Sequence, residues 1–100
     1  MPGRDRVKRH KNREQMKIIN SSNFSKEELI VKERELFNID CAGTVYIESP
    51  FLFDYGTNIH FSGNFYANMD CSFFDTGDIY FGKNVVVSPN VKIYTSFHPI

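Results

Sequence analysis

The 100-residue sequence predicts an all-β core in which the chain winds as a parallel β-helix of about three coils, preceded by one or two short α-helices. Two observations carry this prediction: a repeat of twenty residues, and a hexapeptide pattern inside it. Residues 59–65 and 79–85 share the frame Ile-x-Phe-x-x-Asn-apolar. The alternative is a chance run of similar hexapeptides in an aromatic-rich β protein.

The hexapeptide pattern explains why short strands follow one another. Residues 81–86, 87–92 and 93–98 each open with an apolar residue, place small or polar residues in the middle, and have an apolar residue at position five. In a triangular coil, position one fills the narrow interior and Gly or Asn takes the tight corner. Three hexapeptides make 18 residues, so we interpret Ile79-Tyr80 as a two-residue insertion that completes the period of 20.

Charge divides the chain into parts, although the formal net charge is zero. Residues 1–20 carry seven basic and two acidic residues, whereas residues 41–100 carry two basic and five acidic residues. Residues 1–12 contain almost no apolar residue, which predicts a basic, disordered tail. Binding of nucleic acid by this tail is disfavoured, because no aromatic residue is interleaved to stack on a base.

Residues 13–40 form the predicted helical segment between the tail and the β-helix of residues 41–100. Met16 and Ile19 lie three residues apart and indicate a short helix over residues 13–20. Ser25 and Glu28 have the spacing of a capping box and predict a second helix over residues 26–37. We expect this helix to pack its apolar edge on the β-helix.

The composition excludes several classes of protein. The sequence has neither an apolar run of about 18 residues nor the apolar core of a signal peptide, so we expect a cytoplasmic protein with no membrane partner. Two cysteines, Cys41 and Cys71, are too few for a disulfide framework. Cys71 stands at position five of its hexapeptide, which favours an interior filler over a reactive thiol.

Several stretches resemble one family of enzymes. They are Phe-Asp-Tyr-Gly-Thr-Asn-Ile-His at residues 53–60, Asn-Phe-Tyr-Ala-Asn at 64–68, Val-Ser-Pro-Asn-Val-Lys-Ile-Tyr at 87–94, and Phe-His-Pro at 97–99. The sequence from about Arg13 onward resembles the maltose and galactoside O-acetyltransferases of the hexapeptide-repeat acyltransferase family. The resemblance implies a left-handed β-helix, a homotrimer, and transfer of acetyl from acetyl-CoA to a sugar hydroxyl between subunits, without a metal.

The resemblance also implies roles for five residues. A sugar hydroxyl is a poor nucleophile and needs a base near neutral pH; His98 matches the family's catalytic histidine, although it could be an exposed terminal histidine. Asn68 and Tyr66 match acceptor-binding positions, with a corner Asn and a packed Tyr as the alternative. Asp54 and Asp75 are further acceptor candidates that could equally be solvated acids in turns.

The sequence departs from this family at both ends. The family's first segment is replaced by the basic residues 1–12, and the coils that follow the Phe-His-Pro motif in the family are absent after Ile100. In the family, those coils supply the acetyl-CoA groove and the oxyanion-stabilising groups. We therefore expect a truncated chain with its donor contacts beyond Ile100. The alternative to an enzyme is a catalytically incomplete relative that acts as a fragment or as a structural piece bound to a partner.

A zinc enzyme that hydrates carbon dioxide on the same fold is a further alternative. His60 and His98 would lie two coils apart, or about 10 Å at the usual strand spacing. Zinc binds histidine nitrogen at about 2.0–2.1 Å. One ion cannot reach both side chains, so this alternative is disfavoured.

Overall fold

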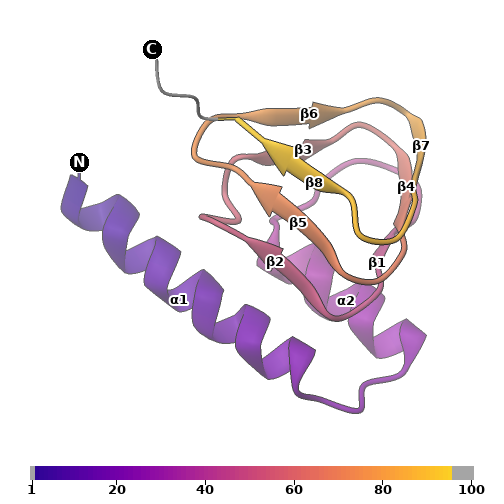
Figure 1. The fold of residues 1–100 in the computed structure, drawn as a ribbon, viewed down its shortest axis with the longest axis horizontal. Helices are drawn as coiled ribbons and strands as arrows, with labels where there is room; N and C mark the ends of the chain where they lie inside the picture. The colour runs from indigo at the N-terminus through magenta and orange to yellow at the C-terminus, as the bar shows by residue number, and fades with distance from the viewer. Residues whose placement is uncertain (1, 96–100) are drawn as a thin grey trace.

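The computed structural model describes residues 2–95, which form two helices and eight strands (Figure 1). The helices are α1 (Pro2–Asn20) and α2 (Lys26–Leu36). The strands are β1 (Val45–Ile47), β2 (Phe51–Phe53), β3 (Ile59–Phe61), β4 (Asn64–Ala67), β5 (Cys71–Phe74), β6 (Ile79–Phe81), β7 (Asn84–Val87) and β8 (Lys92–Tyr94).

The strands stack as a left-handed parallel β-helix, which confirms the predicted fold class. Each face of the triangular prism is a parallel sheet, in the orders β1-β4-β7, β2-β5-β8 and β3-β6 (Figure 1). Val45 pairs with Phe65 and Phe65 pairs with Val85, so successive partners lie twenty residues apart. The same spacing holds in the first coil, where Phe51 pairs with Cys71. The period found in the later sequence therefore extends back to residue 45.

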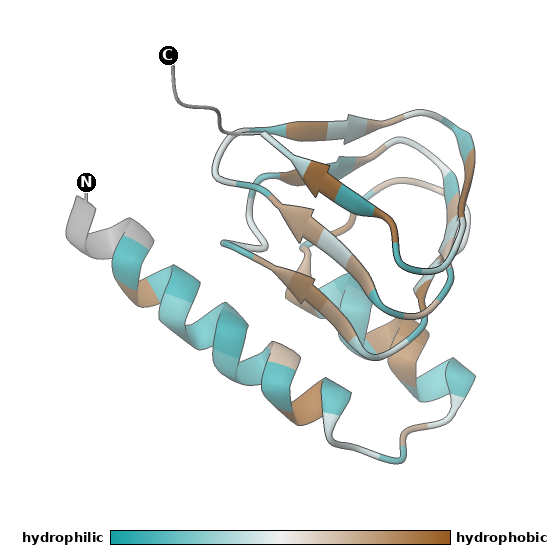
Figure 2. Cartoon of the chain, in the orientation of Figure 1, coloured by the Kyte–Doolittle hydropathy of each residue, from teal (hydrophilic) through white to brown (hydrophobic). Residues whose placement is uncertain are grey.

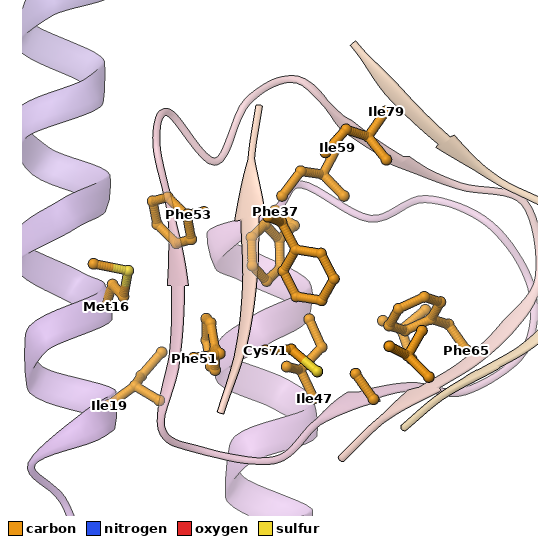
Figure 3. Close-up of a cluster of buried hydrophobic side chains, with 14 of the residues drawn as sticks. Met16, Ile19, Phe37, Ile47, Phe51, Phe53, Ile59, Phe65, Cys71 and Ile79 are labelled. Atoms are coloured by element: carbon orange, nitrogen blue, oxygen red, sulfur yellow. The ribbon is translucent and has the colours of Figure 1, made fainter. Parts of the chain in front are cut away.

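The interior of the prism is filled by the positions that the hexapeptide pattern selects. Ala67, Phe73 and Val87 each stand at position one and are buried. Cys71 is fully buried at position five, as predicted (Figure 3). Phenylalanine rings from successive coils stack on each other, with 5.6 Å between the ring centroids of Phe61 and Phe81. Burial of these large side chains is the main source of stability in the β-helix.

The two residues that extend the coil from 18 to 20 lie in a corner, and not at Ile79-Tyr80. Both of those residues belong to β6, where they pair with Ile59 and His60 of β3. The extra length is in the turns that precede these strands, residues 54–58 and 75–78. The predicted position of the insertion was therefore wrong. The apolar pattern marks the interior positions of the strands, but it does not show which residues form a longer turn around a buried polar side chain.

Helix α1 begins at Pro2, where the sequence predicted a disordered tail over residues 1–12. The helix is held by contacts with distant residues: Nη2 of Arg9 lies 2.6 Å from Oδ1 of Asp54, and Nδ2 of Asn12 donates to the carbonyl of Tyr55. The Arg9 guanidinium also lies 5.0 Å from the centroid of the Tyr55 ring. These tertiary contacts override the weak local signal. Neither helix in the described part of the chain is both long enough and apolar enough to cross a membrane.

The hydropathy of the helices fits their positions. Helix α1 is hydrophilic along most of its length, whereas brown, hydrophobic segments recur in the strands (Figure 2). On the inner side of α1, Met16 and Ile19 are buried against the β-helix (Figure 3). The helix is therefore attached by a narrow apolar edge and by polar anchors.

Helix α2 begins with the predicted capping box and covers the first coil. The Ser25 hydroxyl accepts from the Glu28 N–H, and the Glu28 carboxylate accepts from the Ser25 N–H. Phe37, at the C-terminal end of this helix, packs against the rings of three residues in the first coil, with centroids 5.5–6.0 Å away: Phe51, Phe53 and Phe61.

Glu33 of α2 is a carboxyl group with no exposed surface, packed against β1. Its Oε1 accepts from the N–H of Ile47 at 2.8 Å, whereas its Oε2 has no hydrogen-bond partner among the described residues. Burial raises the pKa of Glu33 from 4.5 to about 8, against the smaller opposing effect of the Ile47 hydrogen bond. Glu33 is therefore mainly protonated in the folded protein at pH 7.

We expect Glu33→Gln to remove part of the pH dependence of stability. Because the folded pKa lies above the ordinary value of 4.5, the folded state binds this proton more tightly. The contribution of Glu33 to the free energy of unfolding is therefore fully present below about pH 4.5 and is lost as the pH rises through about 8. Glutamine keeps an acceptor for Ile47 and does not ionise. As the pH rises from 4.5 to 8, the free energy of unfolding of the variant should therefore increase by on the order of 3 kcal/mol relative to that of the wild type.

The measurement is urea unfolding at a series of pH values. Glu35→Gln, on the exposed face of the same helix, is the matched control and should follow the wild-type pH profile. Parallel profiles for Glu33→Gln and wild type would contradict a protonated Glu33.

Candidate functional site

The residues predicted for the site fall into two groups, and His98 lies outside the residues that the structure describes. Asp54 and Asp75 meet at the corner between β2 and β3, where Oδ1 of Asp75 accepts from the N–H of Asp54 at 3.0 Å. Tyr66 and Asn68 belong to β4 and the turn after it. The two acids therefore share one corner of the coil, whereas Tyr66 and Asn68 lie on β4 and in the turn that follows it.

The side chain of Asp75 shapes the corner and does not face solvent. It is fully buried, and both of its carboxylate oxygens accept from backbone N–H groups of the coil before it. The four donors lie 2.8–3.1 Å away and belong to Asp54, Tyr55, Gly56 and Asn58. Such donors compensate the cost of burying the carboxylate. Asp75 is thus neither a solvated turn acid nor placed to contact a sugar.

Asp54 connects this corner to helix α1. Its carboxylate lies 2.6 Å from Arg9 and 3.8 Å from Arg13, and it accepts from the Thr76 hydroxyl at 2.7 Å. Partial burial acts to raise the pKa of Asp54, but the hydrogen bonds from Arg9 and Thr76 and the two guanidinium charges outweigh it, so the pKa is lowered. The carboxylate of Asp54 is occupied by these ion pairs and by this hydrogen bond, which gives Asp54 a structural role.

Tyr66 lies in a shallow groove of about 420 Å³ on the outer face of the β1-β4-β7 sheet. Its ring centroid is 5.8 Å from that of Tyr46, and the Lys26 ammonium lies 5.5 Å from the centroid of the Tyr46 ring. The carboxylate of Glu48 beside the Tyr66 hydroxyl is the main cause that raises the pKa of this tyrosine. Asn64 also lines the groove. Hydroxyl and amide groups on an open aromatic surface are suited to bind a polyhydroxylated ligand.

Asn68 stands at the end of β4 and is half-buried. Its Oδ1 accepts from the N–H of Met69 at 2.8 Å, and its backbone N–H donates to the carbonyl of Val87. The side-chain oxygen therefore shapes the turn. No residue among 6–95 accepts a hydrogen bond from its Nδ2, which leaves the amide nitrogen as the group that could bind a ligand.

A further cluster of polar and aromatic groups surrounds His60, on the face formed by β3 and β6. Nε2 of His60 lies 2.8 Å from Oδ1 of Asp78, and the imidazole stacks on the ring of Tyr80 with 4.6 Å between centroids. These residues form a cluster that no motif in the sequence indicated, although the twenty-residue period places Tyr80 beside His60. Within the part of the chain that the structure describes, no three His, Cys, Asp or Glu side chains gather closely enough to hold a metal ion.

Asp75→Asn should lower the free energy of unfolding by about 2–4 kcal/mol, because an amide offers one acceptor oxygen where the carboxylate serves four N–H groups. Urea unfolding followed by circular dichroism measures the change. Asp70→Asn is the matched control: Asp70 is exposed at a φ of 66°, a conformation that Asn adopts as readily, so we expect a change within about 0.5 kcal/mol. Unchanged stability of Asp75→Asn would contradict the corner role.

Comparisons with known proteins point to one group of enzymes, although no family model matches the chain. The chain is 35% identical over 79 residues to the galactoside O-acetyltransferase of Escherichia coli, which covers 79% of the chain and 37% of that enzyme. It is 42% identical over 82 residues to a protein of Schizosaccharomyces pombe, covering 78% of the chain and 40% of that protein. The chain thus spans about two fifths of the length of these relatives.

Solved structures agree with the sequence comparisons. A galactoside acetyltransferase in complex with coenzyme A has a TM-score of 0.85 and 32% identity, over 95% of the chain and 48% of that structure. A maltose O-acetyltransferase of Clostridium difficile has a TM-score of 0.79 and 35% identity, over 94% of the chain and 50% of that structure. By sequence and by fold, the chain is similar to galactoside and maltose O-acetyltransferases, and it corresponds to about half of the solved structures that it matches.

Proposed function

We propose that the protein is an O-acetyltransferase that moves acetyl from acetyl-CoA to a hydroxyl group of a sugar. The observation that carries this proposal is the shared fold, at 32–35% identity, with a galactoside acetyltransferase and a maltose O-acetyltransferase. That the galactoside enzyme was solved with coenzyme A supports acetyl-CoA as the donor. The chain aligns with about half of each of these two structures.

The proposed chemistry is attack of a sugar hydroxyl on the thioester carbonyl, with His98 as the general base. The imidazole accepts the hydroxyl proton while the new C–O bond forms, and returns it to the coenzyme A sulfur as the C–S bond breaks. Histidine suits this step because its ordinary pKa lies close to neutral pH. The support for His98 is the sequence Phe97-His98-Pro99, which matches the family's motif.

For the acceptor, we propose contacts from Tyr66 and Asn68. The groove around Tyr66 is open, and the Nδ2 of Asn68 has no acceptor among residues 6–95. Asp54 and Asp75 do not contact the acceptor in this proposal, because both carboxylates hold the corner between β2 and β3. In this proposal they are positioning residues that set the shape of the coil.

We also propose that the protein is a homotrimer, as the resemblance implied. Apolar side chains on the outer faces of the coils support this: Val86, on the sheet face that carries Tyr46 and Tyr66, has 79% of its surface exposed. An apolar surface beside a ligand groove is typical of a contact between subunits.

We expect His98→Ala to lower the rate of acetyl transfer by about 10²–10⁴, the usual contribution of a general base. The assay measures coenzyme A thiol released from acetyl-CoA in the presence of galactosides or maltose. His60→Gln is the matched control, because His60 is a surface histidine bound to Asp78, and it should keep most of the activity. No release of coenzyme A by the wild-type protein would favour the alternative of a catalytically incomplete structural piece.

Asn68→Ala should raise the KM for the sugar by about tenfold and leave the KM for acetyl-CoA unchanged, because one hydrogen bond to the acceptor is lost. The same assay, run at varied concentrations of each substrate, separates the two effects. A change confined to acetyl-CoA would contradict the acceptor assignment.

Val86→Asp should dissociate the proposed trimer, because a charge placed in an apolar contact loses its solvation. Light scattering coupled to size-exclusion chromatography gives the mass of the assembly. Val31→Asp, the same substitution at an exposed position of α2, is the control. A wild-type mass of one chain would rule out the trimer.

A further inference from the structure

The contacts that dock helix α1 use only part of its positive charge. Arg9 and Arg13 reach Asp54, and Lys17 pairs with Glu14 of the same helix at 3.2 Å. Lys8 and Lys11 form no ion pair with any carboxylate in residues 6–95. Their charges therefore remain available to a ligand.

Both of these lysines line a groove between α1 and α2 with a volume of about 920 Å³. Lys32 of α2 lines it from the opposite side and also lies 5.0 Å from the ring centroid of Phe24. One carboxylate, that of Glu35, is in the lining. Three ammonium groups against one carboxylate leave a formal charge of +2 on a concave surface, which concentrates anions there.

The remaining lining suits the organic part of a ligand. Asn12 and Gln15 provide amide groups, and Ile19 and Leu36 provide apolar surface. A smaller cavity of about 270 Å³ shares Lys8 and Leu36 with the groove and extends it toward the β-helix. That cavity contains one further carboxylate, Asp40, together with the hydroxyl of Thr57. The volumes are in the range of small-molecule sites, about 300–1,000 Å³.

We propose that this groove binds an organic phosphate, of the size and charge of a nucleoside diphosphate. Lysine ammonium groups bind phosphate oxygens as point charges, and Lys8, Lys11 and Lys32 supply three of them to one cavity. The amides can bind sugar or base atoms, and the apolar surface can cover a ring. The groove lies between the helices, away from the β1-β4-β7 face that carries Tyr66, so this proposal does not depend on acetyl transfer.

A nucleic-acid strand or an anionic membrane would also be attracted to a basic helix, but the geometry favours a small ligand. The uncompensated lysines lie in a concave groove of about 920 Å³, a volume that fits a small molecule and not a duplex or a flat bilayer. Lys17 of α1, which does not line the groove, is paired with Glu14. Single-strand binding also relies on aromatic side chains, and the sequence of α1 contains none.

The test is isothermal titration of the intact protein with ADP and, separately, with inorganic pyrophosphate. We expect saturable binding of ADP, weaker binding of pyrophosphate, and weakening of both with salt. Lys8→Ala/Lys11→Ala and Lys32→Ala should each lower the affinity for ADP at least tenfold. Lys17→Ala is the matched control, because this lysine is on α1 but outside the groove, and it should bind ADP within twofold of wild type.

Three outcomes would overturn the proposal: no binding of ADP or pyrophosphate at millimolar concentration, equal affinity in the groove variants and wild type, or binding only to single-stranded RNA or phosphatidylserine vesicles. Circular dichroism shows whether each variant is folded; the three lysines are exposed, and Lys32 alone among them lies over an aromatic ring of the described residues, that of Phe24. His98→Ala should bind ADP like wild type, so failure of the proposed acetyl transfer and failure of this site give different results.

Discussion

The carboxylate of Asp75 is the interaction on which the arrangement of the other elements depends. It binds four N–H groups of the preceding coil and so holds the long corner at residues 54–58 in place. Asp54 in that corner then receives Arg9 and Arg13, which fix α1 against the prism. The groove between the helices exists because α1 is held there. One buried acid thus links the period of the strands to the placement of a helix that lies 55 or more residues earlier in the sequence.

Much of the β-helix could be predicted from the sequence because each coil requires the same kind of residue at the same position. Position one must be apolar in every turn, so Ala67, Phe73 and Val87 reveal their interior position by spacing alone. The capping box of α2 was equally predictable, since Ser25 and Glu28 interact within one helical turn. Both signals are local or periodic, and neither requires knowledge of a distant partner.

The features that could not be predicted from the sequence depend on long-range partners. Helix α1 extends to Pro2 because Arg9 and Asn12 bind groups more than forty residues away, which no local pattern shows. Asp75 looked like a surface acid because its four donors are backbone groups, which every residue type carries. For the candidate site, the motif indicated Tyr66 and Asn68; Tyr66 lines an open groove, and the Oδ1 of Asn68 accepts from the N–H of Met69.

The stacked rings of Phe61 and Phe81 show how the interior of this protein is coupled. Each interior side chain meets its equivalent in the next coil, so the core is a set of columns that run along the helix axis. A change of volume at one position is then felt twenty residues away in the sequence, and also across the interior, where the ring centroids of Phe65 and Phe81 lie 4.5 Å apart. Sequence drift in such a core should proceed by compensating changes within one column, in which a larger ring in one coil is matched by a smaller side chain in the next.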